Sequence, residues 1–178
     1  MPRNRRPQPK AEKRAELVSA ARQLFLEDGY DATSISRVAK AASVAPNTIY
    51  WYFDDKDTLL CAVLDELLAE DLAAYTDVAG APLNEQALWL VGRLRRVRGL
   101  MATVHARVAV SPVVADWHDR FHAMVDQVLA QQLGAPVPDA ASAIASFAVE
   151  GLVTHDVDDE RAREVCDALV SSVLVSGA

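Results

Sequence analysis

Two histidines four residues apart have the type and spacing that most directly suggest chemistry. His118 and His122 lie one helical turn apart, so both imidazoles share one face of a helix, as ligands of a zinc site can. No glutamate follows His118, and the pair therefore lacks the general base of a hydrolytic zinc centre. Solvent-facing imidazoles beside Asp119 and Arg120 are the competing interpretation. We assign no metal ligands, and because no nucleophile, base and oxyanion donors are grouped, we expect neither an enzyme nor a cofactor.

A second set of polar residues lies on a short helix that begins at Pro46. Its apolar Ile49 and Phe53 are four residues apart and can face a core. The hydroxyl, amide and aromatic side chains between them then point outward, where they suit contacts to phosphate, sugar and thymine methyl groups. A turn at 42–44 joins this helix to a short helix at 36–41, which is the helix-turn-helix arrangement that reads a DNA major groove.

The elements that must position these residues are helices throughout. Apolar residues recur at spacings of three and four, strand-like alternation is scarce, and Gly and Pro interrupt the pattern. We therefore expect an all-α fold, and we expect Gly99 to end one of its helices. The predicted helices are 11–27, 36–41, 46–52, 56–75, 85–98, a further one reaching 110, 113–133, 139–153 and 159–175.

The charge of the chain is unevenly distributed. Residues 1–60 contain ten Lys and Arg against eight Asp and Glu, whereas the rest of the chain has eight against 17. The excess of positive charge lies at the extreme N-terminus, which is a candidate DNA-binding arm. No apolar segment follows this arm, and no stretch reaches the roughly 18 apolar residues of a membrane span, so we expect a cytoplasmic protein without a membrane partner.

Residues of the N-terminal third closely resemble the DNA-binding domain of TetR-type (TetR/AcrR) transcriptional regulators. The match covers roughly residues 15–64, and the rest of the chain resembles that family only in its helix plan. The residues that carry the resemblance are Gly29-Tyr30-Asp31-Ala32-Thr33-Ser34, the pair Val38-Ala39, and the pattern Thr48-Ile49-Tyr50-Trp51-Tyr52-Phe53-x-x-Lys56-Asp57-x-Leu59-Leu60.

The resemblance implies roles for individual residues. Thr33 and Ser34 would donate to phosphates, and Lys56 would meet a phosphate at the start of a long helix. Arg37 would reach a base or a phosphate, and the arm from Arg3 to Lys10 would add minor-groove or backbone contacts. On the recognition helix, Thr48, Tyr50 and Tyr52 would grip the backbone, with Asn47 and Trp51 nearer to base edges.

Two positions depart from the family pattern. Ser43 stands in the turn where such proteins often have Gly, so a positive φ at this residue would cost strain. Ala45 replaces the common Ser or Thr cap of the recognition helix, which forfeits about 1 kcal/mol.

The resemblance divides the chain into a basic flexible arm at 1–10, a helix-turn-helix domain at 11–55, and a helical ligand-binding and dimerisation domain at 56–178. It implies a pocket for a small-molecule effector in the last of these, and a largely apolar compound with one or two polar groups would fit the available residues. Composition does not separate pocket lining from core. The candidate lining residues are Trp89, Met101, His105, Trp117, Phe121, Met124 and Phe147.

We expect a homodimer that forms through the last two helices and sets two recognition helices about 34 to 36 Å apart on operator DNA. The expected function is a repressor released from a pseudo-palindromic, double-stranded operator when an effector tilts the long fourth helix. The alternatives are a metal-responsive regulator using His118 and His122, or a helical metal-dependent hydrolase. The candidate interface stripes are Ala143, Ile144, Phe147, Ala148 and Gly151, and Ala162, Cys166, Leu169 and Val173.

Overall fold

A computed structural model describes residues 10–176, and the all-α expectation is confirmed. Apart from Lys10, the expected basic arm lies outside the described residues, which contain helices and no strand. The helices are α1 (Lys10–Glu27), α2 (Ile35–Ala41), α3 (Pro46–Tyr50), α4 (Lys56–Tyr75), α5 (Leu83–Arg96), α6 (Arg98–Val108), α7 (Pro112–Leu133), α8 (Asp139–Thr154) and α9 (Asp159–Ser176).

Local signals set the ends of the N-terminal helices. Gly29 follows α1 with a φ of +85°, a left-handed conformation that glycine adopts at little cost and that ends a helix. The Ser34 hydroxyl oxygen caps α2 by accepting from the Arg37 N–H at 3.2 Å. The Asp55 carboxylate caps α4 by accepting from the Thr58 N–H at 2.7 Å. These caps fix where α2 and α4 begin.

The break between α5 and α6 lies at Val97 and not at Gly99, so the predicted position of this break is wrong. Val97 adopts φ −118° and ψ 20°, and Gly99 lies inside the first turn of α6. The break lets α5 bury Val91 in one hydrophobic cluster while α6 buries Leu100 in another. The change of direction is therefore decided by tertiary packing, which outweighs the helix-breaking tendency of a glycine.

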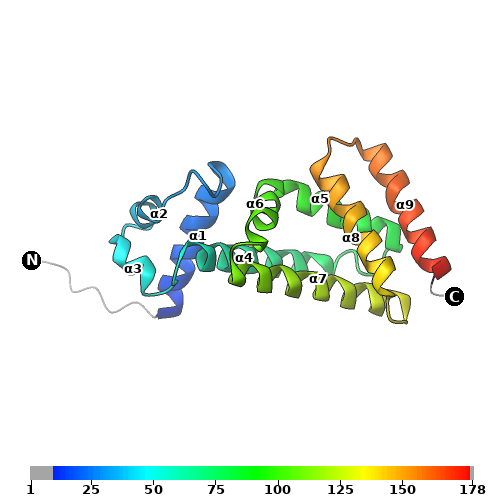
Figure 1. Cartoon of the computed structure of the whole chain (residues 1–178), viewed down its shortest axis with the longest axis horizontal. Coiled ribbons are helices and arrows are strands. Elements are labelled where there is room, and N and C mark those ends of the chain that lie inside the picture. The colour runs from blue at the N-terminus through cyan, green and yellow to red at the C-terminus, as the bar shows by residue number, and fades with distance from the viewer. Residues whose placement is uncertain (1–9, 177–178) are drawn as a thin grey trace, which may run out of the picture.

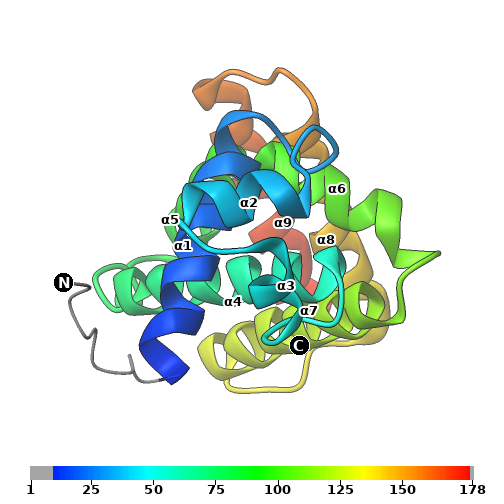
Figure 2. The same cartoon turned by 90° about the vertical axis from the view of Figure 1, so that its left-hand side faces the viewer.

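The helices form an elongated molecule. In Figure 1, α1 to α3 lie at one end, α8 and α9 lie at the other, and α4 and α7 run along the length between them. Seen from the α2–α3 end, α2 crosses in front of α1, and α3 lies to one side of α1 (Figure 2). Within residues 10–176, no helix is long and apolar enough to cross a membrane.

Candidate DNA-binding surface and the cavities behind it

The turn between α2 and α3 has the geometry expected from its two unusual residues. Ser43 has a φ of 54°, and it is the one non-glycine residue with positive φ in the described part of the chain. Ala45 is the N-cap of α3 and makes no side-chain capping hydrogen bond. Pro46 occupies the first turn of α3, where its missing N–H leaves no helical bond unmade. The recognition helix is therefore held by backbone geometry and by packing.

The side chains of α3 and of the three residues after it divide into a buried and an exposed set, as predicted. Ile49 is fully buried and Phe53 is 2% exposed in the core beneath the helix. Tyr50 is 53% and Trp51 is 82% exposed, and Asn47 is also exposed. Large aromatic side chains with this exposure form a ready contact surface for a partner.

Two further residues of the predicted recognition helix are less accessible. Thr48 is half-buried, and Tyr52 is half-buried and packs against the core.

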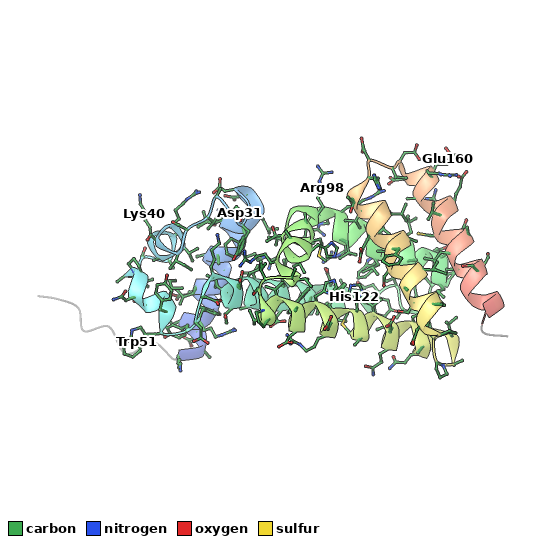
Figure 3. The ribbon with its side chains drawn as sticks, in the orientation of Figure 1. Asp31, Lys40, Trp51, Arg98, His122 and Glu160 are labelled. Carbon is green, nitrogen blue, oxygen red and sulfur yellow. The ribbon has the colours of Figure 1, made fainter. Side chains whose placement is uncertain are left out.

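One cationic residue at this end was missed by the sequence analysis. This residue is Lys40, which is exposed in the last turn of α2. Figure 3 shows Lys40 and Trp51 projecting from the same end of the molecule. The position of Lys40 on α2, beside the predicted turn, was the sequence signal that could have identified it as a DNA-contact candidate.

The structure does not support a phosphate contact from Thr33. Its side chain is fully buried, and its hydroxyl donates to the Gly29 carbonyl at 2.8 Å inside the α1–α2 turn. Thr33 therefore holds the turn together. Ser34 is exposed at the N-terminus of α2, and the exposed Arg37 guanidinium donates to the Asp28 carboxylate at 2.7 Å.

Lys56 lies at the first turn of α4 with its ammonium group on an aromatic ring. The Nζ atom is 3.8 Å from the ring centroid of Tyr30, a cation–π distance. Burial lowers the pKa of Lys56, and the nearby Arg107 charge adds to this effect. The Lys56 ammonium is thus held near the DNA-binding end by Tyr30.

A buried carboxylate ties α4 to α6 and to the α1–α2 turn. Asp57 accepts from the Tyr30 hydroxyl and from Arg107, whose Nη2 lies 2.6 Å from Oδ2. Burial alone would raise the pKa of Asp57, but hydrogen bonds from Arg107, Tyr30 and Ser111 outweigh burial and hold it below its usual value. Burial and the Asp57 charge raise the pKa of Tyr30. This connection joins the helix-turn-helix to α6, and local sequence patterns gave no sign of it.

The candidate ligand residues do not share one cavity. Some line a first cavity, some line a second, and the others line neither of the two. A cavity of about 160 Å³ has an almost wholly apolar lining that includes Trp89, Phe121 and Met124. A second cavity, of about 340 Å³, is lined by Met101 and His105. The two cavities share α5 and α8, but the first also lies against α4, α7 and α9, and the second against α6.

Two candidates line neither cavity. Trp117 is 3% exposed in the core, and its indole N–H donates to the Asp65 carboxylate at 2.9 Å. Phe147 is 72% exposed on α8. Amphipathic spacing alone could not distinguish these environments, because it shows that a residue is apolar but not which surface it meets.

The histidine pair on α7 is not a plain surface feature. His118 and His122 are half-buried, and their Nε2 atoms are 3.1 Å apart. His105 of α6 joins them through ring contact with His118, with centroids 5.5 Å apart. The solvent-facing interpretation of this pair is therefore wrong.

The two predicted interface stripes differ in exposure. On α8, Ile144 is 57% and Phe147 is 72% exposed, so no part of the described chain covers this face. On α9, Ala162 and Cys166 are fully buried in a cluster with Val91 of α5. The α9 stripe packs within the chain, while the side chain of Val173 lies outside the described residues.

Comparisons with known proteins agree with this geometry. The family described as "Bacterial regulatory proteins, tetR family" matches residues 17–63, from α1 into α4. The regulator HbdR of Aromatoleum sp. (strain CIB) is 44% identical over 57 residues, which are 32% of this chain and 25% of HbdR. The regulator UidR of Escherichia coli (strain K12) is 24% identical over 92% of this chain and 91% of its own length.

A solved structure extends the likeness to the whole fold. A transcriptional regulator from Rhodococcus sp. Rha1 superposes with a TM-score of 0.74 and 22% identity, covering 92% of this chain and 96% of that one. Residues 17–63 therefore form a DNA-binding domain of the TetR family, and the matches together support a TetR-family transcriptional regulator. TetR-family proteins bind DNA and small-molecule effectors, typically as dimers. In this chain, α2 and α3 form the helix-turn-helix, and the two cavities lie behind it.

Proposed function

We propose that this TetR-family chain is a repressor that a small molecule releases from a pseudo-palindromic operator. The observation that carries the proposal is the apolar cavity of about 160 Å³, which lies directly against α4, the helix that begins at the DNA-binding end. In this proposal residues 11–55 bind operator DNA in the cytoplasm, residues 56–178 bind the effector and the second subunit, and the chain has no catalytic role.

The exposed residues of α3 support the assignment of DNA contacts. Asn47, Tyr50 and Trp51 would meet base edges and backbone in the major groove, because all three are exposed and Trp51 projects from the end of the molecule (Figure 3). Thr48 and Tyr52 would contribute only their accessible edges. The remaining contacts would come from Ser34, Arg37, Lys40 and Lys56, which present hydroxyl or cationic groups to phosphates.

The cavity indicates the chemistry of the effector. Aromatic and aliphatic side chains make up most of its walls, so an apolar body would gain from leaving water. One part of the wall is polar, because Gln132 Nε2 donates to the Tyr75 hydroxyl at 3.2 Å and Gln86 lies beside both. The effector is therefore a largely apolar compound with a hydrogen-bonding end.

The exposed face of α8 supports a homodimer. Ile144 and Phe147 are large apolar side chains that the described chain leaves open to solvent, and such a patch marks a contact surface. A two-fold partner packing on this face would bury it and would place two recognition helices over successive major grooves. The apolar stripe of α9 packs against α5 and is not free to meet a partner. The opposite, outward face of α9 would therefore complete the interface.

The release mechanism follows from the continuity of α4. Leu68, Leu72 and Tyr75 line the cavity on the C-terminal half of α4, whose N-terminus carries Lys56 and Asp57. An effector that separates the cavity walls would tilt this one helix and change the spacing of the two recognition helices. Operator affinity then falls by the ratio of the effector's affinities for the two states.

The first test is selection of bound sequences from a random DNA pool, followed by titration at several salt concentrations. A pseudo-palindromic winner with a steep negative salt slope is expected for a sequence-reading dimer. A panel of apolar compounds with one polar group is then screened for release of that DNA. Failure to enrich any sequence, or DNA affinity unchanged by every compound that binds the cavity, would refute the proposal.

A matched pair of variants connects release to the cavity. Ala145 lines the cavity, so Ala145→Phe should occupy it and abolish release while leaving operator affinity within about twofold. Ala69→Phe adds the same side chain at an exposed position of α4 and should leave release intact. Equal release in both variants would place the effector elsewhere.

A further inference from the structure

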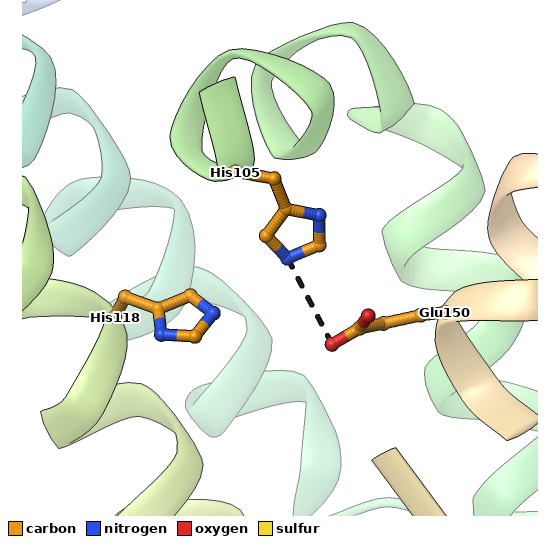
Figure 4. A group of neighbouring side chains, drawn as sticks. All are labelled: His105, His118 and Glu150. Carbon is orange, nitrogen blue, oxygen red and sulfur yellow. Dashed lines mark ion pairs between the residues drawn. The ribbon is translucent and has the colours of Figure 1, made fainter. Parts of the chain in front are cut away.

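Three of the four histidines of the chain gather at one place with a glutamate. His105 of α6, His118 of α7 and Glu150 of α8 each offer a ligand atom, and these atoms lie within 4.8 Å of one another. Figure 4 shows the three side chains pointing toward one another from three different helices. His105 Nε2 lies 3.8 Å from Glu150 Oε1. The cluster thus joins segments that are distant in the sequence.

A fourth group stands beside these three. His122 Nε2 is 3.1 Å from His118 Nε2 and 3.8 Å from Glu150 Oε1. In a tetrahedral site with metal–nitrogen bonds of about 2.0 to 2.1 Å, neighbouring ligand atoms are about 3.4 Å apart. The separations of 3.1 and 3.8 Å lie on both sides of this value, and the group of His105, His118 and Glu150 spans up to 4.8 Å, so side-chain rotations would have to close the groups around an ion.

The second nitrogen of each α7 histidine has a different environment. His118 Nδ1 is buried and has no hydrogen-bond partner among the described residues, although Asp119 Oδ1 is 3.6 Å away. His122 Nδ1 lies 3.3 Å from Ser146 Oγ, a hydrogen bond that can fix the tautomer of a metal-bound histidine.

We propose that His105, His118, His122 and Glu150 bind one divalent transition-metal ion, with Zn²⁺ as the representative ion. Three imidazoles and one carboxylate suit zinc and its neighbours in the first transition row, and they do not suit Mg²⁺ or Ca²⁺, which prefer oxygen ligands. His105 and Glu150 also line the cavity of about 340 Å³, which gives an ion a path from solvent.

The bound ion would join α6, α7 and α8 at one point. Arg107 follows His105 by two residues on α6 and contacts Asp57, so this joint lies next to the connection with the helix-turn-helix. Metal binding itself does not depend on the proposed repressor function, because the site lies outside the apolar cavity and its ligands make no part of the DNA-binding surface.

The test is zinc titration by calorimetry on the full-length, tag-free protein after removal of metal with a chelator. We expect one ion per chain. His118→Ala and Glu150→Gln should each weaken binding by at least about 100-fold, since loss of a group that only hydrogen-bonds to a metal ligand already costs about 10- to 100-fold. His155→Ala is the matched control, because His155 is the one histidine outside the cluster and is exposed.

Thermal unfolding gives a second, independent measurement. Zn²⁺ should raise the melting temperature of the wild type and of His155→Ala but not of His118→Ala, and Mg²⁺ should raise none of them. Glu150 is partly exposed, so Glu150→Gln keeps the test valid if His118→Ala fails to fold. Equal zinc affinity in the wild type and in the cluster variants, or loss of binding in His155→Ala, would overturn the proposal.

Discussion

The helices near the DNA-binding end share one continuous core, whereas the helices at the far end enclose space. Leu17 of α1, Ile49 of α3 and Val104 of α6 are all fully buried in the same hydrophobic cluster. The cluster of α5, α8 and α9 has four buried members among the described residues, and the apolar cavity lies beside it. The comparison shows that the surface that must keep its shape is supported by dense packing, while the region that must admit a ligand keeps unfilled volume.

The polar contacts of the two regions differ in the same way. Asp57, with a side chain 10% exposed, is held by Arg107 and by the Tyr30 hydroxyl. At the far end, Arg95 pairs with Asp159, whose side chain is 89% exposed. Desolvated pairs cost much when one partner is lost, and exposed pairs cost little. Movement is therefore expected in the far half, with the near half responding as a unit.

The largest expected effect compares equal truncations in the two regions. Leu17→Ala should lower the free energy of unfolding by about 3 to 4 kcal/mol, because it leaves a cavity in a packed core. Leu90→Ala removes the same atoms from a wall that already faces unfilled volume and should cost about 1 to 2 kcal/mol. Denaturant unfolding measures both values, and equal losses would break the comparison.

The second largest effect is expected at the buried carboxylate of Asp57. Asp57→Asn should lower the free energy of unfolding by about 2 kcal/mol at neutral pH, because it leaves the Arg107 charge without its partner. Glu164→Gln breaks the exposed ion pair with Arg161 and should cost less than about 0.5 kcal/mol. Urea unfolding at pH 7 distinguishes the two variants.

The same carboxylate predicts a pH dependence. The pKa of Asp57 is lower in the folded protein than in the unfolded chain, so its stabilising contribution is complete well above about pH 4 and is lost as the pH falls through the folded value. The stability difference between the wild type and Asp57→Asn should therefore shrink on acidification. A difference that stays constant from neutral pH to about pH 3 would show that the charge of Asp57 contributes nothing.

A smaller effect is expected at the DNA-binding surface. Tyr50→Ala should weaken operator binding about tenfold without loss of stability, because the side chain is half exposed and packs little. Lys56→Ala should reduce the salt slope of binding by about one, as expected for one phosphate contact. Val110→Ala, exposed between α6 and α7, is the control and should leave operator affinity unchanged in gel-shift titrations.

The smallest effect concerns the turn of the helix-turn-helix. Ser43 has a positive φ, so Ser43→Gly should raise the free energy of unfolding by about 1 kcal/mol. Ala15→Gly, at an exposed position inside α1, should lower it by about 1 kcal/mol. Destabilisation by both substitutions, measured by thermal unfolding, would show that the Ser43 conformation carries no strain.

Local patterns were sufficient to predict most of the fold. Periodicity and caps placed α4 at Lys56–Tyr75, and the departures at Ser43 and Ala45 had the predicted backbone consequences. These features depend on residues within one or two turns of each other, so they can be recognised in the sequence. The split of α3 into a buried and an exposed side follows from the same spacing.

Features that depend on distant partners were not predictable. The Thr33 hydroxyl could face a phosphate or a carbonyl, and only the folded α1–α2 turn decides for the carbonyl. Arg107 and Asp57 are 50 residues apart, and Glu150 reaches the histidines from another helix. Helical spacing likewise could not show that Trp117 is enclosed while Phe147 is open.

The placement of the three tryptophans gives the chain built-in optical reporters. Trp51 stands 82% exposed at the DNA-binding end, Trp89 lines the apolar cavity, and Trp117 is enclosed in the core. An indole in water emits at longer wavelength than a buried one, so these positions have different spectra. Chains that keep a single tryptophan would report DNA contact, cavity occupancy or unfolding separately, without any attached dye.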